Sequence, residues 1–168
     1  MVFCAKSKPF MIKIAIFASG NGSNAENIIH YFSKNSQATV ALVVSNNKDA
    51  YVHIRAESLG VPSCSFNKAE FESGTVVLDT LREYDIDFIV LAGFLLKVSQ
   101  PFLDAYPNKI VNIHPALLPK YGGKGMYGER VHQAVVEARE TESGITIHYI
   151  NENYDEGDIL FQAKCDVL

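Results

Sequence analysis

Cysteine is scarce in this sequence, with only Cys4, Cys64 and Cys165 among 168 residues. Their wide separation matches neither the close pairs of a metal site nor the even set of a disulfide-stabilised secreted domain. The simplest compartment for such a chain is a reducing cytoplasm, where thiols stay free. Histidine does not indicate a metal site either, because the five histidines lack the H-x-x-x-H and H-E-x-x-H spacings.

Long hydrophobic runs and a surplus of positive charge are also missing. No apolar run approaches the roughly 20 residues of a membrane span, and residues 1–10 lack the apolar core of a signal peptide. We expect residues 1–10 to form a short disordered leader. The 15 basic residues are outnumbered by 19 acidic ones, which gives a net charge of −4 without a basic cluster. Binding to nucleic acid or to an anionic membrane through a broad positive face is therefore disfavoured.

The composition that remains is typical of one globular domain. Hydrophobic residues make up 48% of the chain and charged residues 20%, and a length of 168 residues suits a single core. The sequence has no internal repeat, low-complexity segment or linker. Residues 11–168 are therefore predicted to form one domain.

Apolar, strand-like runs alternate with helical segments along this domain. The predicted strands are 12–18, 39–45, 62–66, 88–92 and 109–114, followed by a closing hairpin of 146–150 and 159–163. The predicted helices are 24–32, 54–59, 76–83, 99–106 and 129–138. Strands that are apolar along their whole length indicate a parallel sheet buried on both faces. The predicted fold class is α/β, with a mostly parallel central sheet, helices on both faces and an antiparallel hairpin at the C-terminal end.

Asn112 and His114 stand at the end of the predicted strand 109–114. Residues two apart in a strand point to the same face, and open α/β sheets bind ligands at the carboxyl ends of their strands. An amide and an imidazole at such an end could stabilise an oxyanion and move a proton. Taken alone, the pair is more often a turn residue and a half-buried histidine.

A glycine-rich turn joins the first predicted strand to the first predicted helix: Gly20, Asn21, Gly22, Ser23, Asn24 and Ala25. The turn matches the G-x-G-x-x-A form of the dinucleotide fingerprint, and Ser23 is expected to cap the helix. Free N–H groups at the helix amino terminus could bind an anion. A dinucleotide site also needs an acid after the second strand, where this chain has Ser45-Asn46-Asn47. The turn therefore favours a monophosphate over NAD, with an ordinary tight turn as the alternative.

Four carboxylates lie between the last two predicted strands, at Glu152, Asp155, Glu156 and Asp158. The ordinary interpretation of such a cluster is a solvated hairpin tip. A carboxylate folded back toward His114 would orient the imidazole and favour its charged form, and it could take up a proton through water. The sequence does not choose among the four. His148, on a predicted strand near the same end, could support the pair.

Several motifs occur in the order seen in one enzyme family. They are Ser19-Gly20-Asn21-Gly22-Ser23-Asn24, Leu91-Ala92-Gly93-Phe94, Asn112-Ile113-His114-Pro115 with Leu117-Leu118-Pro119, and Asp155-Glu156-Gly157-Asp158. Together they resemble phosphoribosylglycinamide formyltransferase, the folate-dependent formyltransferase of purine biosynthesis. The resemblance runs from Met11 to Leu168. It implies a Rossmann-like formyltransferase fold and a cis peptide at Leu118–Pro119.

The resemblance also implies a role for each motif. Asn112, His114 and Asp155 would be catalytic, and the turn from Gly20 to Asn24 would hold the phosphate of glycinamide ribonucleotide. The formyl donor would be 10-formyltetrahydrofolate, a co-substrate that requires no metal. Its binding residues would be Phe94, Leu95, Leu96, Lys97, Val98, Asn151, Asn153, Tyr154 and Glu156. Gly157 would give the acidic loop the freedom to fold over the pterin.

The family continues beyond the position of Leu168 into a further segment and helix. We therefore expect this chain to lack that segment, to expose apolar surface, and either to be prone to aggregation or to self-associate, for example as a homodimer.

Other functions stay open from the sequence. A formyltetrahydrofolate hydrolase would need no phosphate anchor, so the turn from Gly20 to Asn24 argues against it. Methionyl-tRNA formylation is disfavoured by the acidic charge. A non-catalytic nucleotide- or folate-binding module is the alternative of a different class.

Overall fold

The computed structural model describes residues 11–167, which contain one seven-stranded sheet. The strand order is β3-β2-β1-β4-β5-β6-β7. The pairings from β3 across to β5 are parallel, whereas β6 and β7 are joined to the sheet by antiparallel pairings. The predicted α/β class is thus confirmed, including the antiparallel hairpin. The predicted leader, residues 1–10, lies outside the described residues.

The bounds of the elements agree with most of the predicted ranges. The strands are β1 (Ile12–Phe17), β2 (Ala38–Ser45), β3 (Ser63–Ser65), β4 (Phe88–Leu91), β5 (Ile110–His114), β6 (Glu142–Tyr149) and β7 (Ile159–Asp166). The helices are α1 (Ser23–Phe32), α2 (Val52–Ser58), α3 (Lys68–Ser73), α4 (Thr75–Glu83), α5 (Gln100–Ala105) and α6 (Glu129–Glu137). Helix α3 was not predicted, and the hairpin strands are longer than expected.

Both differences have a local cause. Helix α3 is too short to show a helical period, but Asn67 and Glu70 form a capping box that marks its start. The β6–β7 ladder extends through polar residues, since Glu142 pairs with Asp166 and Ser143 with Cys165. A hydrophobic pattern does not detect a ladder that continues beyond the apolar residues.

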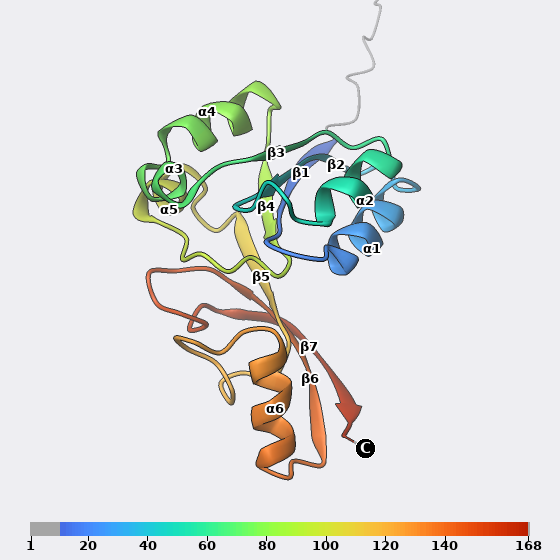
Figure 1. Cartoon of the computed structure of the whole chain (residues 1–168), viewed down its shortest axis with the longest axis vertical. Helices are drawn as coiled ribbons and strands as arrows, with labels where there is room; N and C mark the ends of the chain where they lie inside the picture. Colours follow the sequence, from blue (N-terminus) through green and yellow to red (C-terminus); the bar gives the residue numbers. More distant parts are fainter. Residues whose placement is uncertain (1–10, 168) are drawn as a thin grey trace, which may run out of the picture.

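Helices cover both faces of the parallel part of the sheet (Figure 1). Helices α1 and α2 lie on one face, where Ala25, Ile29, Val52 and Ala56 pack against the sheet. Helices α3, α4 and α5 lie on the other, over a core that includes Phe17, Phe71, Leu81 and Phe102. Burial on both faces explains why the strands are apolar along their length.

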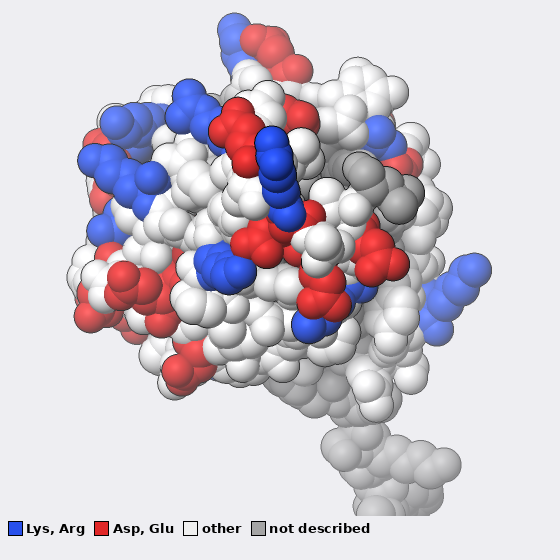
Figure 2. Space-filling view, turned by 90° about the horizontal axis from the view of Figure 1, so that it is seen from below, with Lys and Arg blue, Asp and Glu red and all other residues white. Residues whose placement is uncertain are grey.

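The hairpin end of the molecule is built differently. Helix α6 lies beside β6 and buries Val131 and Val135 (Figure 1). Strand β7 forms the edge of the sheet, and its Ile159, Leu160 and Phe161 are exposed. Figure 2 shows acidic and basic side chains interspersed on the face seen from below. No helix among residues 11–167 is long and apolar enough to cross a membrane.

The prediction that Ser23 caps α1 was wrong. The N-cap is Gly22, with φ 77° and ψ 21°, and no side chain makes a capping hydrogen bond. Ser23 is instead the first helical residue. The turn packs closely on α2, because a Cβ atom at Gly22 would lie 2.4 Å from Cγ2 of Val52. Close approach of two backbones, with a left-handed φ, therefore requires glycine here.

We expect Gly22→Ala to lower the free energy of unfolding by about 1–3 kcal/mol, from the left-handed strain and the contact with Val52. Urea-induced unfolding followed by circular dichroism measures this change. Gly20→Ala is the matched control, because a Cβ atom there meets nothing within 4 Å. Equal stability of the two variants would contradict the packing argument.

Candidate active site

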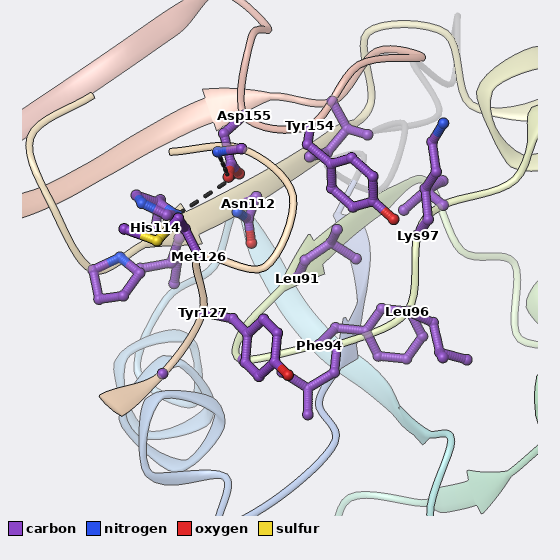
Figure 3. A pocket seen from close by; sticks show the side chains of 18 of the residues that line it. Leu91, Phe94, Leu96, Lys97, Asn112, His114, Met126, Tyr127, Tyr154 and Asp155 are labelled. Carbon is purple, nitrogen blue, oxygen red and sulfur yellow. Dashed lines mark hydrogen bonds and ion pairs between the residues drawn. The ribbon is translucent and has the colours of Figure 1, made fainter. Parts of the chain in front are cut away.

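Asn112 and His114 lie at the carboxyl end of β5, and Asp155 reaches them from the loop between β6 and β7. The Nδ1 atom of His114 is 3.7 Å from Oδ1 of Asp155 (Figure 3). The His114 side chain is 3% exposed and that of Asp155 is 12% exposed. The structure thus selects Asp155 from the four candidate carboxylates.

His114 is held from its other ring nitrogen by the backbone. Its Nε2–H donates to the carbonyl oxygen of Tyr121 at 2.7 Å. Because a carbonyl can only accept, Nε2 carries a proton in both the neutral and the charged ring. The Nδ1 atom is then the site that gains or loses a proton, and it is the atom that faces Asp155.

His148 joins this group from β6. It is fully buried, and in the sheet it pairs directly with Asn112. Its Nδ1–H donates to the carbonyl of Tyr149 at 2.9 Å. Its Nε2 lies 3.2 Å from the Asn112 amide nitrogen and 3.5 Å from Oδ1 of Asp155. His148 therefore lies between the amide and the carboxylate, near the position predicted for it.

Asp155 is held as a carboxylate. Burial alone raises its pKa, but hydrogen bonds from His148 and from the Gly123 N–H, with the charges of His114 and His148, bring the pKa below its usual value. The Gly123 N–H donates to Oδ2 at 2.9 Å. Asp155 has φ 56°, a left-handed conformation that Asp tolerates better than most residues. An ionised carboxylate beside an imidazole can store and return a proton.

The role predicted for Gly157 was wrong in its physical reason. Its φ is not in the left-handed region. A Cβ atom there would lie 1.8 Å from the carbonyl oxygen of Tyr149. Glycine is therefore needed for close packing of the loop on β6, which fixes the loop instead of loosening it.

A cleft of about 390 Å³ opens beside the group, with the lining side chains drawn in Figure 3. It is lined by all but one of the predicted folate residues: Phe94, Leu95, Leu96, Lys97, Val98, Asn151, Asn153 and Tyr154. The remaining one, Glu156, is exposed and does not line it. The Lys97 ammonium lies over the Tyr154 ring, 5.4 Å from its centroid. Among residues 11–167, no cluster of His, Cys, Asp and Glu could hold a metal ion.

Two hydrogen-bond networks, around Ser19 and around Thr146, fix the walls of the cleft. The Ser19 hydroxyl donates to Asn46 and accepts from the Leu95 N–H, which ties the segment after β4 to the ends of β1 and β2. The Thr146 hydroxyl donates to the Ala116 carbonyl and accepts from the Leu118 N–H. The chain therefore turns sharply after His114, and the predicted cis peptide at Leu118–Pro119 is present.

Several lining residues were missed by the sequence analysis. Met126 and Tyr127 line the cleft from the segment between β5 and α6, and His132 lines it from α6 (Figure 3 labels Met126 and Tyr127). The glycines around them gave this segment the pattern of a plain loop. Its only visible signal was the pair of bulky residues, Met126 and Tyr127, within a glycine-rich run.

The predicted phosphate turn lies beside the cleft and only partly in it. Asn24 lines the cleft, whereas Gly20, Asn21, Gly22 and Ser23 do not. Arg55 of α2, which the sequence analysis missed, donates to the backbone and side-chain oxygens of Asn21, each at 2.9 Å. Arg55 also pairs with Glu26 of α1. The turn is thereby fixed between two helices.

The chain is similar to known formyltransferases. Residues 12–168 match the family described as Formyl transferase. A chloroplastic phosphoribosylglycinamide formyltransferase from Arabidopsis thaliana is 44% identical over 167 residues, which cover 96% of this chain and 57% of that protein. The phosphoribosylglycinamide formyltransferase of Haemophilus influenzae is 38% identical over 163 residues, which cover 94% of this chain and 74% of that protein.

A solved structure agrees with these sequence matches. Glycinamide ribonucleotide transformylase 1 from Symbiobacterium toebii has a TM-score of 0.85 at 34% identity, over 94% of this chain and 74% of that one. The chain spans little more than half the length of the Arabidopsis relative. The fold, the motifs and the extent of these matches agree, and the chain belongs to the formyl transferase family, in the group of the phosphoribosylglycinamide formyltransferases.

Proposed function

We propose that this protein transfers a formyl group from 10-formyltetrahydrofolate to the amine of glycinamide ribonucleotide, in purine biosynthesis. The observation that carries the proposal is the buried His114–Asp155 pair beside Asn112, at the edge of a cleft. The names of the Arabidopsis and Haemophilus relatives support the same reaction.

In this mechanism the amine of the ribonucleotide attacks the formyl carbon and a new C–N bond forms. Negative charge develops on the formyl oxygen, where the Asn112 amide and the Nδ1–H of a protonated His114 donate hydrogen bonds. Asp155 then receives a proton from the attacking nitrogen, through water or through His114. The bond between the formyl carbon and the folate nitrogen breaks, and that nitrogen takes up the proton that Asp155 received. No covalent enzyme intermediate is required.

The walls of the cleft fit the two substrates. The pterin would lie between the segment after Phe94 and the loop from Asn151 to Asp158. Leu91, Leu96 and Ile150 give this end an apolar surface suited to a flat ring. The ribonucleotide would enter from the side of Asn24, with its phosphate at the amino terminus of α1.

One assay tests this function directly. The protein is mixed with 10-formyltetrahydrofolate, with and without glycinamide ribonucleotide, and loss of the formyl donor is followed by absorbance. Turnover that depends on the amine substrate supports the transferase. Turnover with water alone would identify a hydrolase, and binding without turnover would identify a binding module.

We expect Ser23→Asp to weaken ribonucleotide binding by about tenfold or more, because a carboxylate at the helix amino terminus repels the phosphate. Folate binding should barely change. Calorimetry with each substrate measures both affinities. Asn27→Asp adds the same charge one turn further along α1 and serves as the matched control. Tight binding of NAD or NADP would contradict the assignment of this turn to a monophosphate.

We also infer a cytoplasmic location. Cys64 and Cys165 are free thiols, which suits a reducing compartment. Burial raises the pKa of Cys64 to about 11, so this thiol is unreactive at neutral pH.

A further inference from the structure

Residues 121–123 contact both members of the buried pair from their outer sides. The Tyr121 carbonyl accepts the Nε2–H of His114 at 2.7 Å. Two residues later, the Gly123 N–H donates to Oδ2 of Asp155 at 2.9 Å. The atoms left facing each other are Nδ1 of His114 and Oδ1 of Asp155, 3.7 Å apart. One short segment thus sets the separation of the two groups.

Residue 122 must be small for this contact. A Cβ atom at Gly122 would lie 2.6 Å from a methyl group of Leu118 and 3.2 Å from Cβ of Asp155. Tyr121 has φ 57°, a conformation that an aromatic residue adopts only when other contacts hold it.

The contact that holds Tyr121 comes from its own side chain. The Tyr121 hydroxyl donates to Oε1 of Glu140 at 2.9 Å, just beyond the end of α6. Lys120 binds the same oxygen at 2.8 Å. These bonds keep the pKa of Glu140 below its usual value, so the acceptor is a carboxylate at neutral pH.

We propose that Tyr121 is a positioning residue for His114. Its hydroxyl, anchored on Glu140, holds the Tyr121 carbonyl against Nε2 and so decides which ring nitrogen of His114 carries the proton. The competitor is Asp155, whose carboxylate favours a proton on Nδ1. The inference rests on the proposed catalytic roles of His114 and Asp155 for its effect on turnover. The state of the ring itself can be measured without any reaction.

The test is Tyr121→Phe, with long-range proton–nitrogen NMR of the histidine rings at a pH where they are neutral. The His114 signals are identified by comparison with His114→Gln. Wild-type protein should show His114 with its proton on Nε2. In Tyr121→Phe we expect the ratio of the two tautomers to shift about fivefold toward Nδ1–H, the scale of one net hydrogen bond. In the formyl-transfer assay, kcat should fall about three- to tenfold with little change in KM.

The same hydrogen bond can also be tested from its acceptor, Glu140. Glu140→Gln keeps an oxygen acceptor and should resemble wild type, whereas Glu140→Ala should reproduce the Tyr121→Phe result. The two Glu140 variants test whether this hydrogen bond sets the His114 tautomer, even if Tyr121→Phe does not fold. Tyr31→Phe, which removes an exposed hydroxyl on α1, is the matched control.

An unchanged tautomer in both Tyr121→Phe and Glu140→Ala would overturn the inference. Absence of formyl transfer in the wild-type protein would instead overturn the proposed function, and the NMR result would still stand.

Discussion

His114→Ala should lower the turnover of the formyl-transfer reaction by about 10³-fold, which combines a lost oxyanion donor with lost proton transfer. The imidazole is the side chain whose Nδ1 faces Asp155, and its Nε2 is already committed to the Tyr121 carbonyl. Removing the imidazole takes away the side chain that donates a hydrogen bond to the formyl oxygen and transfers a proton in the proposed mechanism. Steady-state kinetics with both substrates, at saturating concentrations, measures the change.

The controls for His114→Ala separate chemistry from folding. His30→Ala replaces an exposed histidine on α1 and should leave turnover unchanged. The melting temperature and the affinity for the ribonucleotide should show that His114→Ala is folded and binds. Turnover within tenfold of wild type would remove His114 from the mechanism.

Asp155→Asn should lower turnover by at least about 10²-fold, the scale of lost general acid–base catalysis. The replacement is conservative in shape, and Asn tolerates the left-handed φ of 56° at this position. An amide can still accept the Gly123 N–H, but it cannot hold a proton from the attacking amine. Normal turnover in a folded variant would exclude Asp155 as the proton acceptor.

The same variant should alter how stability depends on pH. The folded-state pKa of Asp155 is lowered, so the carboxylate stabilises the fold fully above its unfolded pKa of about 3.9. That stabilisation is lost as the pH falls through the folded-state value. Wild type should therefore lose more stability than Asp155→Asn on acidification below about pH 4. Urea unfolding of both proteins at neutral and acidic pH measures the difference, and parallel curves would contradict it.

His114 and Asp155 should not act independently. Their facing atoms are 3.7 Å apart, so the double variant should be little worse than His114→Ala alone. Additive losses would mean that the two side chains serve separate steps.

Local patterns were sufficient to predict the sheet and all of the described helices except α3. The strands of the parallel part, such as β1, β2 and β4, are apolar along most of their length, and this pattern can be recognised without any knowledge of neighbouring elements. The position of Asn112 and His114 at a strand end follows from the same pattern, since two prolines stop the strand. The family motifs then singled out Asp155 among the acidic residues.

Other features depended on contacts between distant segments. From the sequence, Ser23 was expected to cap α1 and Gly157 to give its loop freedom. In the fold, Gly22 is the N-cap, and Gly22 and Gly157 are needed for close packing against Val52 and Tyr149. Arg55 binds the turn from 34 residues away. No local pattern records such a pairing, because its partners meet only when α1, α2 and the sheet have assembled.

The sequence by itself thus determined the strand pattern, the fold class and the residue types of the candidate site. Only the tertiary structure decided that Asp155 lies 3.7 Å from His114, that His148 lies between Asn112 and Asp155, and that residues 121–123 hold the pair from outside. The physical reason is that the apolar pattern of a strand reflects the burial of that segment alone, so it can be recognised in the sequence. The separation of two side chains depends instead on the antiparallel register of β5 and β6 and on a loop packed across them.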